Sequence, residues 1–323
     1  MQKILIARYL EDVCLQGLTA EFEFIHPTKE QNCFSRQELL ERVGDCQALF
    51  CCLNPCDKQL IDQGVQLKAI SNMGVGYDNI DWQYATEKGI AVVNTPSSVT
   101  APTADLTMGL LLSALRRISY YDRRLRSQKL FATELFYDGS THVEDKLLGL
   151  IGFGRIGKAV AARAAAFGMK IAYYDPFRAA PEAEAALQAT YMELDQLLAT
   201  ADVISLHLPY APAARHLING AALARMKPSA YLINAARGPI VEEAALITAL
   251  QQGSIRGAAL DVYEFEPKVP QELLELDNVV LVPHIGTMAW EARMNMAREA
   301  LDGLAGVLRG EKPANVVNRT VLD

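Results

Sequence analysis

Short apolar segments alternate with longer Ala- and Leu-rich segments along the whole chain. Short apolar runs bounded by turn residues predict strands, and the longer segments between them predict helices. The predicted strands are residues 4–7, 48–53, 69–72, 91–94, 147–152, 170–174, 203–207, 231–234, 257–260 and 279–282. Such alternation is typical of βαβ units with parallel strands, and we expect the strands to divide between two α/β domains.

One turn-rich stretch, residues 94–98, suggests a domain boundary. It precedes a long predicted helix from about Thr100 to Arg126 with Pro102 in its first turn, which we expect to cross between the domains. Polar, aperiodic residues 127–145 follow this helix. Because they exceed an ordinary connection, we expect them to form an extension used in subunit contact.

Composition narrows the class of protein. The chain has 323 residues, of which 50% are hydrophobic and 21% are charged, which is typical of a globular protein of about two domains. Its formal net charge is −7, and its Lys and Arg residues are scattered. A nucleic acid or an anionic membrane needs a basic face, so we expect neither as a partner.

The chain begins with a strand-like apolar segment and without the pattern of a signal peptide, which favours a cytoplasmic location. No apolar run approaches the roughly 20 residues of a membrane span. All six cysteines lie in the first 56 residues, without a C-x-x-C pair or a His at zinc spacing. We therefore expect them to be reduced, buried and unconnected with any metal.

A glycine-rich turn, Gly152-Phe153-Gly154-Arg155-Ile156-Gly157, lies between a predicted strand and a predicted helix. In dinucleotide-binding units the first glycine permits the tight turn, the second lets the backbone approach the pyrophosphate, and the third lets helix pack on strand. The helix N-terminus then holds the phosphates. This context predicts a dinucleotide site.

Asp175 ends the next predicted strand. Its distance along the chain from the last glycine is close to the roughly 20 residues that this motif requires. Its carboxylate is expected to bind the ribose hydroxyls and to repel a 2′-phosphate. NAD is therefore favoured over NADP, although Arg178 lies near enough in sequence to keep NADP open.

Three charged residues follow predicted strands in the second half of the chain, namely Arg237, Glu266 and His284. Ligands bind at the carboxyl ends of strands in such sheets. Reduction of a 2-keto acid requires a cation for the carboxylate, a hydride donor and an acid for the forming alkoxide. The planar guanidinium of Arg237 suits the first role, and His284, oriented by Glu266, suits the last. Taken singly, each residue also has a structural explanation.

Several segments resemble the signature blocks of the D-isomer-specific 2-hydroxyacid dehydrogenases, and together they span most of the chain. They are Gly74-Val75-Gly76-Tyr77-Asp78-Asn79-Ile80-Asp81, Asn94-Thr95-Pro96, Asn234-Ala235-Ala236-Arg237-Gly238, Asp261-Val262-Tyr263-Glu264-Phe265-Glu266-Pro267 and Val282-Pro283-His284-Ile285-Gly286. The sequence departs from the family at Ala211, where many members have Thr.

The resemblance implies an α/β fold in which an NAD(P)-binding Rossmann domain is inserted in a flavodoxin-like substrate domain, usually in a homodimer. The substrate domain would comprise residues 1–100 and 291–323, and the Rossmann domain residues 101–290. This discontinuous arrangement replaces a simple division of the chain into an N-terminal and a C-terminal domain.

The resemblance also implies roles for individual residues. Arg237, Glu266 and His284 would be catalytic, and backbone amides around Gly74, Val75 and Gly76 would join Arg237 in binding the substrate. The cofactor would contact Gly152, Gly154, Arg155, Ile156, Gly157, Asp175, Leu208, Ala235, Ala236, Asp261 and Gly286. No metal is expected.

These features predict an NAD-dependent reductase of small 2-keto acids such as glyoxylate, hydroxypyruvate or pyruvate. Specificity is expected to depend on Asn72, Met73, Val75 and Tyr77 and on residues near Met288 and Trp290. Two alternatives stay open: a short-form phosphoglycerate dehydrogenase, and an NADH-responsive binding protein similar to the C-terminal-binding-protein corepressors. A family member that oxidises phosphite is disfavoured, because a resemblance to such an enzyme would require Lys at the position of Val75.

Overall fold

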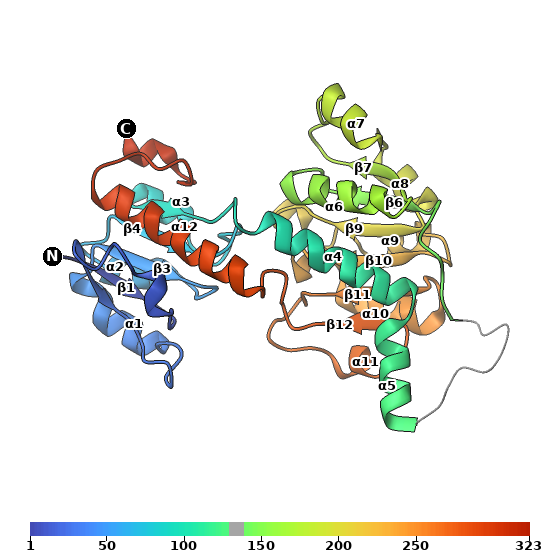
Figure 1. Cartoon of the computed structure of the whole chain (residues 1–323), viewed down its shortest axis with the longest axis horizontal. Helices are drawn as coiled ribbons and strands as arrows, with labels where there is room; N and C mark the ends of the chain where they lie inside the picture. Colours follow the sequence, from blue (N-terminus) through green and yellow to red (C-terminus); the bar gives the residue numbers. More distant parts are fainter. Residues whose placement is uncertain (129–138) are drawn as a thin grey trace. The chain divides into compact units, whose positions relative to one another are not determined.

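The structure, a computed structural model, describes residues 1–128 and 139–323 and divides the chain into two compact units. Unit 1 comprises Met1–Val99 and Thr287–Asp323, so both ends of the chain belong to it, and unit 2 comprises Thr100–Gly286. Part of the predicted polar extension, residues 127–145, falls outside the described residues. Figure 1 shows that each unit combines strands with covering helices.

Unit 1 is built on a parallel five-stranded sheet in the order β2-β1-β3-β4-β5. This is the flavodoxin-like order. The strands are β1 (Gln2–Ile6), β2 (Phe22–Ile25), β3 (Ala48–Cys51), β4 (Ala69–Asn72) and β5 (Ala91–Val93). The helices are α1 (Arg36–Arg42), α2 (Lys58–Gln63), α3 (Trp82–Glu87) and α12 (Trp290–Leu308).

The C-terminal helix α12 completes the core of unit 1. Its apolar face, which includes Ala297, Ala300, Leu301 and Leu304, is buried with residues of the N-terminal strands. Figure 1 shows this orange-red helix beside the blue strands of the same unit. Burial of apolar side chains from both ends of the chain, at roughly 25 cal/mol per Å², therefore stabilises one core.

All six cysteines of unit 1 are free thiols. Five are buried, as predicted, whereas Cys33 is only partly buried. Burial raises the pKa of the Cys46 thiol to about 12, helped by the neighbouring carboxylate of Asp45. Such a thiol is unreactive at neutral pH.

Unit 2 is built on a parallel seven-stranded sheet in the order β12-β11-β10-β9-β6-β7-β8. Its first six strands in sequence have the order of a Rossmann fold, with a seventh strand added at one edge. The strands are β6 (Leu147–Ile151), β7 (Lys170–Tyr174), β8 (Ala189–Tyr191), β9 (Val203–Leu206), β10 (Tyr231–Asn234), β11 (Gly257–Leu260) and β12 (Val279–Leu281).

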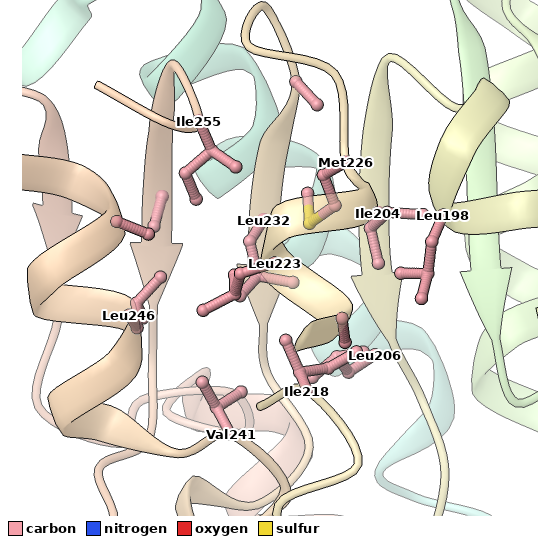
Figure 2. Packing of buried hydrophobic residues seen from close by; sticks show 14 of the residues in the cluster. Leu198, Ile204, Leu206, Ile218, Leu223, Met226, Leu232, Val241, Leu246 and Ile255 are labelled. Atoms are coloured by element: carbon pink, nitrogen blue, oxygen red, sulfur yellow. The ribbon is translucent and has the colours of Figure 1, made fainter. Parts of the chain in front are cut away.

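Helices cover the sheet of unit 2 above two buried clusters. The helices of unit 2 are α4 (Thr100–Leu115), α5 (Ile118–Gln128), α6 (Arg155–Ala166), α7 (Pro181–Leu187), α8 (Leu194–Thr200), α9 (Gly220–Arg225), α10 (Glu243–Gln252) and α11 (Gln271–Leu274), of which α5 contributes no residue to the two clusters. Figure 2 shows one cluster, in which Leu232 of β10 lies beside Leu223 of α9, and Leu206 of β9 lies beside Ile218. The expected α/β fold is confirmed.

Two predictions about elements were wrong. The helix expected from about Thr100 to Arg126 is broken at Arg117, whose φ is +53°. The buried face of α4 ends at Leu115, and the helix that follows, α5, is strongly polar. The break therefore occurs where the apolar contact with the core ends. The strands β2 and β8 were missed. Both are short edge strands, which lack the continuous apolar runs of strands that are buried on both faces.

No helix among the described residues has the length and apolar character needed to cross a membrane.

Candidate active site

The glycine turn joins β6 to α6 in unit 2. Gly152 has a φ of +96°, and a side chain there would come within 2.6 Å of the His207 carbonyl group. A side chain at Gly157 would collide with the carbonyl oxygen of Gly152. The space beside Gly154, in contrast, is open. The turn is thus closely packed on its protein side and accessible at the glycine expected to face the pyrophosphate.

Gly154 is also the N-cap residue of α6, and it has no side chain to cap the first helical amides. These amides and the helix dipole make an anion-binding position. The glycine turn follows β6 and His207 follows β9, which are neighbouring strands at the point where the strand order reverses. Dinucleotides bind in the crevice at such a point. The residues present therefore fit a dinucleotide with its phosphates at Gly154, Arg155 and Ile156.

Asp175 lies immediately after β7, next to the glycine turn. One carboxylate oxygen accepts a hydrogen bond from the Phe153 amide at 2.8 Å, and the other accepts from the Phe177 amide at 2.9 Å. These bonds hold the carboxylate in place beside the turn. Each carboxylate oxygen can accept a further bond, so the group suits a pair of ribose hydroxyls.

The structure brings His284 and Glu266 together in unit 2. His284 Nδ1 lies 2.9 Å from Glu266 Oε2, and the Tyr263 amide donates to Glu266 Oε1 at 3.0 Å. An ionised carboxylate can only accept, so Nδ1 bears the proton in this pair. The other ring nitrogen, Nε2, is then the atom able to exchange a proton with a substrate.

Glu266 is held as a carboxylate. Burial by itself would raise its pKa, but hydrogen bonds from His284 and the Tyr263 amide, with the positive charges of His284 and Arg237, bring the pKa below its usual range. Arg237 follows β10, and its Nη1 donates to the Ala236 carbonyl at 2.8 Å. The charge of Arg237 therefore acts on the same carboxylate that orients His284.

Asp261 fixes the segment that contains His284. Its carboxylate accepts from the amides of Ile285 at 2.6 Å and Gly286 at 2.9 Å, and its carbonyl accepts from the His284 amide at 2.9 Å. His284 itself has a φ of +54°, a strained conformation for a residue with a side chain. Burial raises the pKa of Asp261, opposed by these amides and by the charge of His284. A contact of Asp261 with nicotinamide remains a prediction.

The glycine loop of unit 1 follows β4. The carbonyls of its three residues accept hydrogen bonds: Gly74 from the Thr95 amide at 3.0 Å, Val75 from Asn94 Nδ2 at 2.8 Å, and Gly76 from Asn72 Nδ2 at 2.6 Å. Within the described part of the chain, the amides of Val75 and Gly76 donate to no acceptor. Amides left available in a fixed loop suit a carboxylate.

Comparison with known proteins decides the family. The model of the D-isomer specific 2-hydroxyacid dehydrogenase NAD-binding domain matches residues 108–286, more than half of the chain. A protein of Staphylococcus aureus strain MRSA252, named "Putative 2-hydroxyacid dehydrogenase SAR2389", is 44% identical over 98% of this chain and 100% of its own. The chain belongs to the D-isomer specific 2-hydroxyacid dehydrogenases.

Solved structures of related enzymes are similar to this dehydrogenase over nearly its whole length. A glyoxylate reductase from Paecilomyes thermophila is 33% identical, with a TM-score of 0.88 and 98% of each chain covered. An NADPH-dependent glyoxylate/hydroxypyruvate reductase from Sinorhizobium meliloti, solved with NADP and malonate, is 30% identical, with a TM-score of 0.84, 99% of this chain and 97% of that chain covered. These matches confirm the family and the Rossmann fold. They also confirm that the protein is an oxidoreductase that acts on CH–OH groups with NAD(P).

The remaining predicted cofactor residues of the dehydrogenase lie around the same strand ends. Leu208 follows β9, Ala235 and Ala236 follow β10, and the Ala236 amide donates to Asn234 Oδ1 at 3.0 Å. Asn234 is buried and donates in turn to the Arg237 carbonyl at 3.0 Å. Asn234 therefore fixes the turn that presents Arg237, a role that the sequence did not reveal.

A second histidine–glutamate pair also escaped the sequence analysis. His216 Nε2 lies 2.6 Å from Glu264 Oε1, and the His216 amide donates to the Pro239 carbonyl at 2.9 Å. Glu264 and Glu243 exchange two bonds, each from a backbone amide to the other's carboxylate at 3.2 Å. These contacts tie together the segments after β10 and β11, which contain Arg237 and Glu266. Glu264 stands in the quoted family motif, but nothing in the sequence marks His216 as its partner.

Of the residues expected to set specificity, Met288 and Trp290 are 59% and 63% exposed in unit 1, so neither is fixed by a core. Asn72, in contrast, is buried, and its side chain organises the glycine loop, donating to Gly76 and accepting from the Leu53 amide at 3.2 Å. Asn72 therefore has a structural role in the glycine loop, in addition to the predicted role in specificity.

Proposed function

We propose that this protein is an NAD-dependent D-2-hydroxyacid dehydrogenase that reversibly reduces a small 2-keto acid of the glyoxylate, hydroxypyruvate or pyruvate class. The observation that supports it most is the pair formed by His284 and Glu266, with Arg237 acting on the same carboxylate. It provides a positioned acid and a cation, the two groups that this reduction requires of the protein.

Each residue has a separate task in the proposed reaction. Arg237 binds the substrate and polarises the keto group, and the amides of Val75 and Gly76 bind the carboxylate. Nicotinamide, when bound, supplies or accepts the hydride. His284 donates the Nε2 proton to the carbonyl oxygen as it becomes an alkoxide, and accepts that proton in the reverse direction. Glu266 keeps the imidazole oriented and stabilises its charged form.

NAD is the proposed cofactor, with NADP less favoured. Support comes from Asp175, whose carboxylate is fixed beside the glycine turn by two backbone amides. A carboxylate there binds ribose hydroxyls and repels a 2′-phosphate. NADP use by a relative such as the Sinorhizobium meliloti reductase makes a direct comparison of both cofactors necessary.

The test is reduction of a panel of small 2-keto acids by NADH and by NADPH, in the wild type and in His284→Gln. We expect turnover of at least one acid with NADH, and a loss of about 10²- to 10⁴-fold in kcat in the variant with retained NADH binding. No turnover of any acid, or an unaffected variant, would contradict the proposal.

The same measurements separate the alternatives. A short-form phosphoglycerate dehydrogenase would prefer a phosphorylated substrate, which the panel should include. An NADH-responsive binding protein would bind NADH without appreciable turnover. The expected homodimer and cytoplasmic location remain predictions, the first of which analytical ultracentrifugation would test.

A further inference from the structure

Beside Asp175, Arg178 is held by an acidic residue of α7. Arg178 Nε and Nη2 donate to the two carboxylate oxygens of Glu184 at 2.9 Å and 3.1 Å. The guanidinium also lies 5.4 Å from the ring centre of Tyr191. Paired bonds of this kind fix both the position and the orientation of the guanidinium plane.

Glu184 is itself anchored from the sheet. The Tyr173 hydroxyl, at the end of β7, donates to Glu184 Oε1 at 2.5 Å and accepts from the Ala179 amide at 3.0 Å. Hydrogen bonds from Arg178 and Tyr173 lower the pKa of Glu184, so it remains charged at neutral pH. The side chain of Glu184 is only 14% exposed, against 65% for Arg178. The carboxylate is therefore the fixed partner, and the arginine is held against it.

Arg178 is placed where it bears on cofactor choice. Phe177, the residue before it, donates its amide to the Asp175 carboxylate that is expected to bind the ribose. In dinucleotide-binding units, an arginine near this acid is the usual receptor for the 2′-phosphate of NADP. In this protein, that arginine would have to give up two bonds to Glu184 before it could bind a phosphate.

We propose that Glu184 determines cofactor specificity by holding Arg178 away from the 2′-phosphate position, so that NADPH binding is disfavoured by Glu184 as well as by Asp175. This inference rests on the proposed use of NAD. Glu184 excludes the phosphate in two ways, because it occupies the guanidinium and adds a negative charge. Only the first way depends on Arg178, and this dependence makes the proposal testable.

The experiment measures the Kd of NADH and of NADPH by nicotinamide fluorescence, which requires no keto acid. Asp175→Ser serves as the background, because it removes the carboxylate that would otherwise repel the phosphate. In this background we expect Glu184→Gln to tighten NADPH binding about five- to tenfold and to leave the Kd of NADH within about twofold. Gln keeps the bond to Tyr173, and the retained NADH affinity shows that the variant is folded.

Arg178→Ala distinguishes the two ways of exclusion. Added to the Asp175→Ser background, it should reduce the effect of Glu184→Gln on NADPH to less than about twofold. A matched control is Glu21→Gln, which breaks an equally bidentate pair with Arg309 in unit 1, at 2.7 Å and 2.8 Å. The control should change neither Kd.

The proposal is overturned if Glu184→Gln leaves NADPH binding unchanged, or if the gain is equally large without Arg178. A failure of the proposed function has a different outcome, namely absence of turnover with every keto acid while these binding constants are still measurable. Tighter binding of NADPH than of NADH by the wild type would refute the preference for NAD separately.

Discussion

At the scale of single residues, the proposed chemistry depends on charge held next to one imidazole. The 2.9 Å contact between His284 and Glu266 places a carboxylate where it fixes the orientation of the ring. The pKa of Glu266 is below its usual range, because the hydrogen bonds from His284 and the Tyr263 amide outweigh its burial. Glu266 therefore stays ionised down to mildly acidic pH, and the pair remains intact there.

This gives a prediction for Glu266→Gln. The amide has the size of the carboxylate but carries no charge, so it holds Nδ1 of His284 less firmly. We expect kcat for keto acid reduction to fall by at least about tenfold, while the Kd of NADH changes less than about twofold. Initial rates and a fluorescence titration measure these quantities, with wild type as reference. An unchanged kcat would mean that the carboxylate is not needed to orient the ring.

A second prediction concerns Arg237→Lys. Lysine keeps the charge but cannot form two parallel bonds with a carboxylate or keto acid. We expect kcat/KM to fall by at least about tenfold, mainly through KM, while the Kd of NADH changes less than about twofold. Steady-state kinetics and a fluorescence titration would show this. Equal kinetics of Lys and Arg would show that only the charge at this position matters.

At the scale of elements, the relative placement of the segments after β10 and β11 decides whether the catalytic residues meet. Gly238, next to Arg237, packs so closely on the Tyr263 carbonyl that a side chain there would collide with the backbone. The bonds of His216, Glu264 and Glu243 tie the same two segments together. This close backbone contact, together with those side-chain bonds, sets the spacing of the two segments.

Gly238→Ala should therefore impair catalysis more than cofactor binding. The added methyl group must displace the segment of Glu266 from that of Arg237, and we expect kcat/KM to fall at least about tenfold. Gly109→Ala is the matched control, because Gly109 lies in α4 with no atom near the position of an added Cβ. That change should preserve activity and stabilise the helix by about 0.5–1 kcal/mol. Full activity of Gly238→Ala would refute the packing argument.

At the scale of the whole molecule, His207 makes the stability of the folded state depend on pH. Its Nε2 lies 2.8 Å from the Ser205 hydroxyl, whereas its buried Nδ1 contacts no polar group among the described residues. Burial lowers the pKa of His207 from 6.5 to about 3. The folded state thus keeps the ring neutral at pH values at which the unfolded chain binds a proton.

The sign of the resulting effect follows from linkage. Since the unfolded state binds more protons below about pH 6.5, the free energy of unfolding should fall as pH decreases, by about 1–2 kcal/mol at pH 5 from this residue. His207→Gln, which keeps a polar group for Ser205, should reduce that loss. Scanning calorimetry at pH 5 and pH 8 measures this change in the free energy of unfolding. Both tryptophans, Trp82 and Trp290, belong to unit 1, so their fluorescence provides an internal reference. Parallel pH dependence of wild type and variant would contradict the assignment.

The sequence by itself determined the type of most elements and the chemistry of the candidate residues. Strands β4, β7, β10 and β11 were predicted to the residue, because strands buried on both faces have continuous apolar runs. The glycine turn was evident because its glycines and their spacing are local requirements of the backbone. The positions of Arg237, Glu266 and His284 after predicted strands marked them as candidates, and the resemblance to the family implied their catalytic role.

Only the tertiary structure decided which groups contact one another. The bidentate hold of Glu184 on Arg178 and the pair of His216 with Glu264 join residues that no periodicity relates. The availability of the Val75 and Gly76 amides is likewise evident only from the hydrogen bonds of the folded loop. The break at Arg117 was equally hidden, because neither Gly nor Pro marks it. Local pattern reflects burial and backbone conformation, whereas contacts between distant segments depend on how the sheets and loops pack in three dimensions.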